Sequence, residues 1–256
     1  MMTEFWSYST FITIASITVI TGIYISAIKN KFPKIPLLLI LLSASIASFV
    51  GARLLYVFTS KSLYQGDYSN FFDLEFHGFS LFGGLAFALI ISWTLTKIFK
   101  INTSKLADLS APYVGIGIAI IRIGCFIRGC CFGKETNLFL GINPGIFSPA
   151  HFYQLKNGSN QLFTVNPIHP TQIYEILAAL TGSFIAFNLI KRKLKNGITS
   201  LVFVMWFTAL RWIIHYFRVE SETFNMSSNF YPIIYLMIIS SSILILLKIN
   251  RSKVKI

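Results

Sequence analysis

Residues 36–58 read PLLLILLSASIASFVGARLLYVF, a run in which Arg53 is the one charged side chain. A helix needs about 20 apolar residues to cross the hydrocarbon core of a bilayer, so this run is long enough to span a membrane. Further apolar runs of similar length lie on both sides of it. The sequence therefore predicts an all-α integral membrane protein, one transmembrane domain over residues 1–256, with seven spans. These are expected at about 9–28, 36–58, 79–98, 110–130, 170–190, 198–217 and 229–248.

The composition of the chain agrees with a membrane protein. Of its 256 residues 54% are hydrophobic and 12% charged, and the mean hydropathy is +0.67. Soluble domains carry about twice that share of charged residues, so a soluble enzyme is excluded. The net charge of +13 would indicate nucleic acid binding in a soluble protein. In a membrane protein it bears on orientation instead, and no nucleic acid partner is expected.

The positive charges alternate along the connections between the runs. Fourteen of the 22 Lys and Arg residues follow the first, third, fifth and seventh runs. By the positive-inside rule the N-terminus lies outside and the C-terminus in the cytoplasm. The first run carries no preceding Lys or Arg and no cleavage site, so it is expected to remain in the mature protein. The long segment 131–169, rich in Gly and Pro, is expected to form a small extracytoplasmic arm or head.

Five ionisable side chains fall inside the apolar runs: Arg53, Arg122, Arg128, Arg211 and Glu175. A charge at the bilayer centre costs about 2.5–3.5 kcal/mol on insertion scales, so each should pair, face the protein interior or reach the headgroups. Four cations cannot all be neutralised by one acid. The imbalance favours an anion-binding cavity, for which a phospholipid phosphate is the obvious ligand.

Five segments carry a resemblance to a known family. Together they resemble the prolipoprotein diacylglyceryl transferases over most of the chain. The segments are GARLLYV at 51–57, SLFGGL at 80–85, RIGCFIRGCCFG at 122–133, HPTQIYE at 169–175 and LRWIIHYFR at 210–218.

The resemblance implies a multi-pass enzyme of the bacterial cytoplasmic (inner) membrane that acts in lipoprotein biosynthesis. Such a transferase moves the diacylglyceryl group of phosphatidylglycerol onto the lipobox cysteine thiol of a prolipoprotein signal peptide and forms a thioether. Its partners are the lipid bilayer, phosphatidylglycerol and the prolipoprotein. No cofactor and no metal are expected.

The resemblance also assigns roles to the arginines. Arg122 and Arg211 are expected to act in catalysis and to hold the lipid phosphate, and Arg218 is expected to bind the headgroup. A planar guanidinium matches a phosphate with two hydrogen bonds. Arg211, His215 and Arg218 share one helical face, because they are spaced by four and three residues. The alternative for Arg122 is a snorkelling anchor at a helix end, and for Arg218 the choice stays open.

HPTQIYE matches the family motif His-Pro-Ser-Gln-Leu-Tyr-Glu almost residue for residue. His169 and Gln172 are expected at the outer mouth, with Tyr174 also in contact with substrate. Glu175 lies about 1.5 turns deeper than His169 and is expected to orient an arginine. The alternative is a helix whose Tyr174 and Glu175 only form interhelical hydrogen bonds. Tyr24 matches a family tyrosine and is a further candidate for substrate binding.

The chain departs from the family motif at the residue expected to deprotonate the acceptor thiol. The family has His where this chain has Phe82, and a hydrocarbon ring accepts no proton. His77 and His169 are the substitutes, or an arginine cluster lowers the pKa of the thiol instead. Four glycines at motif positions are expected to let the backbone approach the lipid closely. They are Gly83, Gly84, Gly124 and Gly133.

The three cysteines, Cys125, Cys130 and Cys131, replace or follow polar residues of the family signature. Small buried thiols at a helix contact explain them most simply. Metal binding together with His169, or nucleophilic attack by a thiol, are the alternatives.

Two other functions remain open at this stage. A non-catalytic or repurposed relative that binds or transports an anionic phospholipid is favoured by Phe82 and Cys125. A secondary transporter for an anion would predict inverted repeats, and the sequence has no clear repeat.

Overall fold

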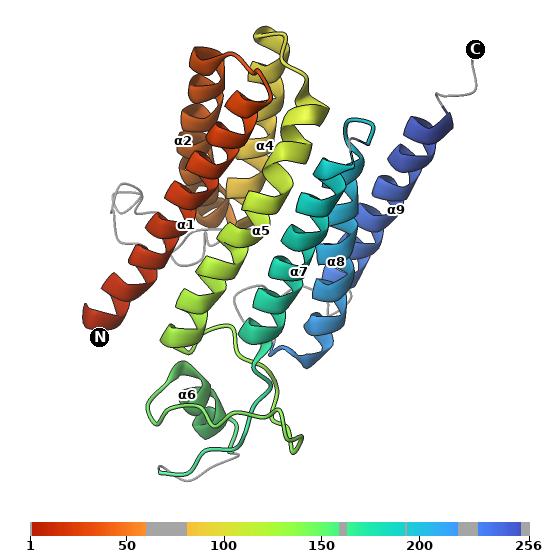
Figure 1. Cartoon of the computed structure of the whole chain (residues 1–256). Helices are drawn as coiled ribbons and strands as arrows, with labels where there is room; N and C mark the ends of the chain where they lie inside the picture. Colours follow the sequence, from red (N-terminus) through yellow and green to blue (C-terminus); the bar gives the residue numbers. More distant parts are fainter. Residues whose placement is uncertain (1, 60–80, 159–162, 193, 220–229, 252–256) are drawn as a thin grey trace. The chain divides into compact units, whose positions relative to one another are not determined.

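The computed structural model describes residues 2–59, 81–158, 163–192, 194–219 and 230–251. Over these residues the secondary structure is helical, with isolated β-bridges (Figure 1). The chain divides into two compact units, which we describe separately: the smaller unit, Ile20–Leu106, and the larger unit, Met1–Val19 with Ala107–Ile256. The prediction of one domain stays a prediction. The helices are α1 (Met2–Lys29), α2 (Lys34–Thr59), α4 (Leu81–Ile98), α5 (Thr103–Arg128), α6 (Pro149–Lys156), α7 (Thr171–Lys191), α8 (Ile198–Phe217) and α9 (Phe230–Arg251).

Six helices of the described chain are long and apolar enough to cross a membrane, so the prediction of an all-α membrane protein is confirmed at this level. The apolar part of α4, Gly83–Ile98, is shorter than the other six. The predicted run 198–217 coincides with α8, and the remaining five begin or end within a few residues of their predicted bounds. Large apolar side chains such as Phe184 and Leu244 are 70% and 67% exposed, as expected for helix faces that meet lipid.

In the smaller unit, α2 and α4 pack with their backbones in close approach. A methyl group added at Gly83 would lie 2.2 Å from the carbonyl oxygen of Gly51, and one added at Gly51 would lie 2.6 Å from that of Gly83. Gly84 faces Ser48 in the same way, at 3.0 Å. Small residues let membrane helices approach closely where no hydrophobic force draws them together. Gly83 and Gly84 therefore hold α4 against α2.

In the larger unit, α7 packs against α5 and α8 through small residues. A Cβ at Gly115 of α5 would lie 2.8 Å from the carbonyl oxygen of Ala179 in α7. Trp206 of α8 donates its indole N–H to the carbonyl of Ala178, at 3.1 Å. The close approach of α5, α7 and α8 places their polar side chains within reach of one another.

The start of α8 is fixed by a carboxylate from another helix. Gly197 precedes α8 with a φ of 97°, a left-handed conformation that favours glycine. The backbone N–H groups of Gly197 and Ser200 donate to Asp108 of α5, at 2.6 and 2.8 Å. A negative charge at a helix N-terminus satisfies free N–H groups and the helix dipole. This contact anchors the far end of α8 from Arg218.

The segment that connects α5 to α7 contains α6 and extends from the ends of those two helices (Figure 1). Ser148 caps α6 by accepting from the N–H of His151, and Pro149 occupies its first turn. Isolated bridges join Gly133 to Arg218, and both Glu135 and Ile142 to Ile168. They tie the segment to the start of α7 and the end of α8.

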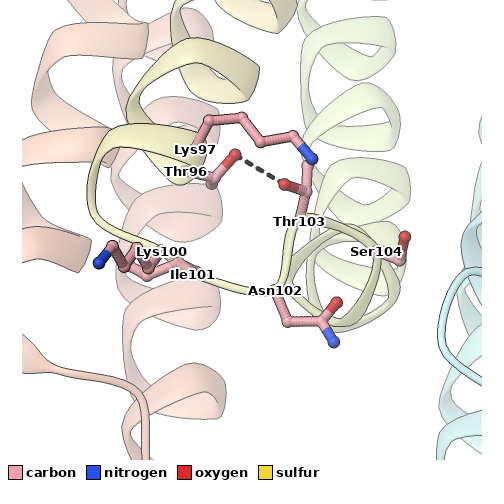
Figure 2. A pocket seen from close by; sticks show the side chains of 7 residues that line it. All are labelled: Thr96, Lys97, Lys100, Ile101, Asn102, Thr103 and Ser104. Carbon is pink, nitrogen blue, oxygen red and sulfur yellow. Dashed lines mark hydrogen bonds between the residues drawn. The ribbon is translucent and has the colours of Figure 1, made fainter.

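A polar pocket of about 430 Å³ lies at the connection between α4 and α5 in the smaller unit. Figure 2 shows the hydrogen bond between the hydroxyls of Thr96 and Thr103, which are 2.8 Å apart, and the side chains of Lys97 and Lys100, which also line the pocket. It contains none of the residues predicted to bind lipid.

Candidate functional site

Three arginines of the larger unit converge on one carboxylate, that of Glu175 in α7. Arg122 of α5 contacts Oε2 through its Nε, Arg211 of α8 donates to Oε1 at 2.6 Å, and Arg218 lies 3.5 Å from the same oxygen. We call these four residues the arginine–glutamate cluster. The side chain of Glu175 is 3% exposed and that of Arg122 12%, whereas Arg211 and Arg218 are 23% and 24% exposed.

The cluster carries an unbalanced charge. Three guanidinium groups and one carboxylate leave a net charge of +2 within these four side chains. Buried ion pairs repay their desolvation only when the charges are matched and hydrogen-bonded. The surplus positive charge, next to partly exposed Arg211 and Arg218, is therefore suited to a bound anion. The predicted pairing of Glu175 with an arginine is thus seen, with three arginines in place of one.

The motif around His169 fixes where α7 begins. His169 is 8% exposed; its Nδ1 lies 3.2 Å from the hydroxyl of Tyr174, and its ring centroid lies 4.9 Å from that of Phe217. Its backbone exchanges hydrogen bonds with Lys134 and Gly133. The motif thus joins His169 to Tyr174, the residue that precedes Glu175 of the arginine–glutamate cluster.

Thr171 and Gln172 bind the chain that follows α5. The hydroxyl of Thr171 donates to the carbonyl of Cys131, and the amide of Gln172 donates to that of Cys130, both at 2.7 Å. Gln172 is 4% exposed, and its Oε1 has no hydrogen-bond partner among the described residues. The sequence predicted that Gln172 contacts the substrate, but in the structure its amide nitrogen donates to the carbonyl of Cys130. Thr171 was missed as a candidate, although its place in the HPTQIYE motif is a signal that would find it.

The end of α5 forms a turn that folds the cysteines together. Gly129 has a φ of 69°; its N–H donates to the carbonyl of Phe126, and that of Cys130 donates to the carbonyl of Cys125. This is a Schellman motif, in which the residue after the glycine returns onto the last helical turn. The sulfur atoms of Cys125, Cys130 and Cys131, here called the cysteine cluster, lie within 4.8 Å of one another.

The cysteine cluster borders the arginine–glutamate cluster. A guanidinium nitrogen of Arg122 lies 3.7 Å from the sulfur of Cys125. Hydrogen bonds from the thiols of Cys125 and Cys130 hold the pKa of Cys131 well below its usual value, and the charges of Arg218 and Arg122 lower it further. Cys131 therefore favours the thiolate form. All three cysteines are free thiols.

Two of the predicted glycines lie in the larger unit, where they pack against protein. A Cβ at Gly124 would lie 2.8 Å from the Cβ of Phe11 in α1. One at Gly133 would lie 2.5 Å from both the carbonyl oxygen and the Cβ of His169. A side chain is therefore excluded at Gly133, where the chain passes His169, and at Gly124, where α5 packs against α1. The proposed contact of these glycines with lipid stays a prediction.

The remaining predicted residues are not part of the cluster in the larger unit. Tyr24 lies in the part of α1 that belongs to the smaller unit, as do Gly83 and Gly84 in α4. His77 lies outside the described residues. His215 of α8 turns its ring toward Tyr231 and Tyr235 of α9, with ring centroids 5.7 and 6.2 Å apart. Of the predicted site, the structure joins Arg122, Arg211 and Arg218 to Glu175. Separately, it joins His169 to Tyr174 and Gln172 to the carbonyl of Cys130.

Surplus guanidinium groups among the helices of a membrane protein are typical of proteins with a polar functional site inside the membrane. The comparison with known families narrows this class. The family model of prolipoprotein diacylglyceryl transferase matches residues 2–248, so the chain belongs to that family.

Relatives named phosphatidylglycerol–prolipoprotein diacylglyceryl transferase are similar to most of the chain. The protein of Dehalococcoides mccartyi is 26% identical over 179 residues, which cover 69% of this chain and 63% of the relative. That of Listeria innocua is 28% identical over 195 residues, or 75% and 67% of the two chains. That of Rickettsia bellii is 30% identical over 204 residues, or 76% and 72%. The matched part thus spans less than two thirds of the Dehalococcoides protein.

Proposed function

We propose that this chain transfers the diacylglyceryl group of phosphatidylglycerol to the lipobox cysteine thiol of prolipoproteins. The observation that carries the proposal is the convergence of Arg122, Arg211 and Arg218 on the single carboxylate of Glu175. Membership of the prolipoprotein diacylglyceryl transferase family and the names of the relatives support the same reaction.

The cluster is suited to the phosphate of the lipid. Phosphatidylglycerol carries one negative charge on its phosphodiester, and the four side chains supply a net charge of +2. Arg211 and Arg218 are the more exposed arginines, so they meet the phosphate first. Arg122 binds Glu175 through its Nε and Cys125 through one terminal nitrogen, which leaves its other terminal nitrogen for the phosphate.

The reaction increases the charge that the cluster has to stabilise. The sulfur of the acceptor thiolate forms a bond to the glyceryl carbon that carries the phosphate. The bond between this carbon and the phosphate oxygen breaks, and the electron pair leaves with glycerol phosphate. A monoester carries more negative charge than the diester, so fixed guanidinium groups bind the transition state more tightly than the ground state.

The acceptor thiol must lose a proton before it attacks. His169 is the described histidine whose Nδ1 is engaged with Tyr174, the residue that precedes Glu175. Its Nε2 is then the atom that accepts the proton, with Tyr174 fixing the orientation of the ring. The guanidinium groups lower the pKa of an incoming thiol in the same way as they favour the thiolate of Cys131.

For the placement in the membrane, we infer seven spans, an outer N-terminus, a cytoplasmic C-terminus, and an extracytoplasmic arm over residues 131–169 in the bacterial inner membrane. The distribution of Lys and Arg supports this orientation. The end of α5, the start of α7 and the end of α8 all adjoin the arm, and the arginine–glutamate cluster lies near these ends. A prolipoprotein on the outer face then meets the lipid headgroup close to the arm.

A second candidate, a relative that binds anionic phospholipid without transfer, is favoured by Phe82, which stands where the family has His. Purified protein in vesicles of phosphatidylglycerol, given a lipobox peptide, separates the two. The enzyme adds the mass of a diacylglyceryl group to the peptide. A binder retains the lipid and leaves the peptide unchanged. A peptide with Ser in place of the lipobox Cys, and vesicles of phosphatidylethanolamine, are the controls, and rescue of a depleted bacterial strain tests the same reaction in cells.

A further inference from the structure

The cysteine cluster has the geometry of a ligand set for a soft metal. The three sulfur atoms lie within 4.8 Å of one another. Metal–sulfur bonds of about 2.3 Å place the sulfurs of a trigonal centre about 4 Å apart. A small contraction of the cluster is thus sufficient to surround an ion. The chain holds 3 cysteines in all, so every thiol of the protein is in this cluster.

The backbone around the cysteine cluster holds the three thiols close together without a bound ion. The Schellman turn at Gly129 brings Cys130 over Cys125, and Cys131 follows with a φ of 61°. The side chains of Thr171 and Gln172 then fix the carbonyls of Cys131 and Cys130 from α7. Groups that orient ligands in this way raise metal affinity, because fewer degrees of freedom are lost on binding. If the three thiols only packed against their neighbours, the carbonyls of Cys130 and Cys131 would not both need a hydrogen bond from a buried side chain.

The number of donors and the neighbouring charge indicate which ion fits. Among the described residues, no His, Asp or Glu joins the three sulfurs. Structural Zn²⁺ takes four protein ligands, whereas thiolates also select Cu(I), which is satisfied by three. Three thiolates and Cu(I) carry a charge of −2, which matches the net +2 of the adjoining arginine–glutamate cluster.

We propose that Cys125, Cys130 and Cys131 bind one Cu(I) ion through their three sulfur atoms. Binding releases the thiol protons to solvent and changes no oxidation state, so it needs no oxidant or reductant. The proposal departs from the expectation of no metal drawn from the sequence. No atom of the cysteine cluster takes part in the transfer, but the bound centre would balance the charge that the proposed function assigns to the lipid phosphate, so the two activities are measured apart.

A competition titration tests the site directly. The full chain, purified in detergent under reducing conditions, is titrated with Cu(I) against a chelator whose Cu(I) complex is coloured. We expect one equivalent to be withheld from the chelator, and each of Cys125→Ser, Cys130→Ser and Cys131→Ser to weaken binding at least tenfold. Failure to withhold an equivalent, full retention of copper when all three are Ser, or displacement of Cu(I) by equimolar Zn²⁺ would each overturn the proposal.

Alkylation of the natural chain provides a second measurement that needs no variant. Iodoacetamide adds one mass increment per accessible thiol, and Cu(I) is expected to reduce the number of increments. Equal labelling with and without Cu(I) contradicts the site even if a serine variant fails to fold. Transfer to the lipobox peptide is measured separately with copper chelated. Loss of transfer with copper binding intact counts against the proposed function, and the reverse result counts against the copper site.

Discussion

The contact between α2 and α4 differs in kind from the contacts among α5, α7 and α8, although residues of the family motifs form both. Between α2 and α4, Gly51 and Gly83 remove side chains so that two backbones touch. By contrast, ion pairs join α5, α7 and α8, because Glu175 contacts both Arg122 and Arg211. The first arrangement is complete within the protein, whereas the second has surplus charge. Residues of the family motifs can therefore serve close packing or place charge at a helix contact, and only the contacts in the structure distinguish the two.

The largest expected effect comes from removing a guanidinium group from the charged contact. We expect Arg122→Ala to lower the rate of diacylglyceryl transfer at least about a hundredfold, because a fixed donor to the developing phosphate is lost. Mass spectrometry of the lipobox peptide measures the rate. Arg251→Ala, at the exposed end of α9, removes an arginine of no assigned role and should leave transfer unchanged. Normal turnover of the Arg122 variant would refute the role given to this residue.

The second prediction concerns the carboxylate of Glu175, whose removal increases the surplus positive charge of the cluster. Glu175→Gln keeps the shape of the side chain but leaves three guanidinium groups together, which should lower the free energy of unfolding by about 3 kcal/mol. A bound phosphate can replace the lost charge. Phosphatidylglycerol should therefore raise the thermal unfolding temperature of the variant by more than that of the natural protein. An equal increase in both proteins would mean that the lipid does not share the site of Glu175.

The glycine contact predicts a loss of stability from a single methyl group. In Gly83→Ala the new Cβ meets the carbonyl oxygen of Gly51, and overpacking of this kind costs about 1–3 kcal/mol. Gly145→Ala is the control, because a Cβ there has no described atom within 4 Å. Thermal unfolding in detergent compares the two variants. If Gly83→Ala is as stable as the control, the close approach of α2 and α4 is wrong.

A smaller effect is expected at the rim of the cluster. Arg218 lies 3.5 Å from Glu175 and is more exposed than Arg122. We expect Arg218→Ala to reduce transfer about tenfold, through weaker capture of the headgroup, since a single charged contact in a partly exposed site is worth about 1.5 kcal/mol. The dependence of the rate on the phosphatidylglycerol content of the vesicles measures this loss. A variant as inactive as Arg122→Ala would place Arg218 at the reacting phosphate instead.

Hydropathy and local motifs predicted the helices well, because a membrane span is defined by its own sequence. The prediction of 198–217 agrees with α8 at both ends. The surplus of intramembrane arginines predicted an anion-binding cavity, which stays a prediction, and the structure brings Arg122 and Arg211 together at Glu175. The sharing of Glu175 by three arginines was not predictable, since it depends on how α5, α7 and α8 pack. For the same reason, the sequence did not predict that Gly83 packs against Gly51 or that Gly133 packs against His169, and the predicted contact of these glycines with lipid stays a prediction.

The most direct measurement is the binding of phosphatidylglycerol to the purified protein, compared between the natural chain and the double variant Arg122→Ala, Arg211→Ala by native mass spectrometry. Phosphatidylethanolamine, whose headgroup is neutral overall, serves as the reference lipid. If the surplus guanidinium charge holds the phosphate, the natural chain retains phosphatidylglycerol in preference to the reference lipid and the variant loses this preference. Equal retention of phosphatidylglycerol by both proteins would contradict a lipid site at the arginine–glutamate cluster.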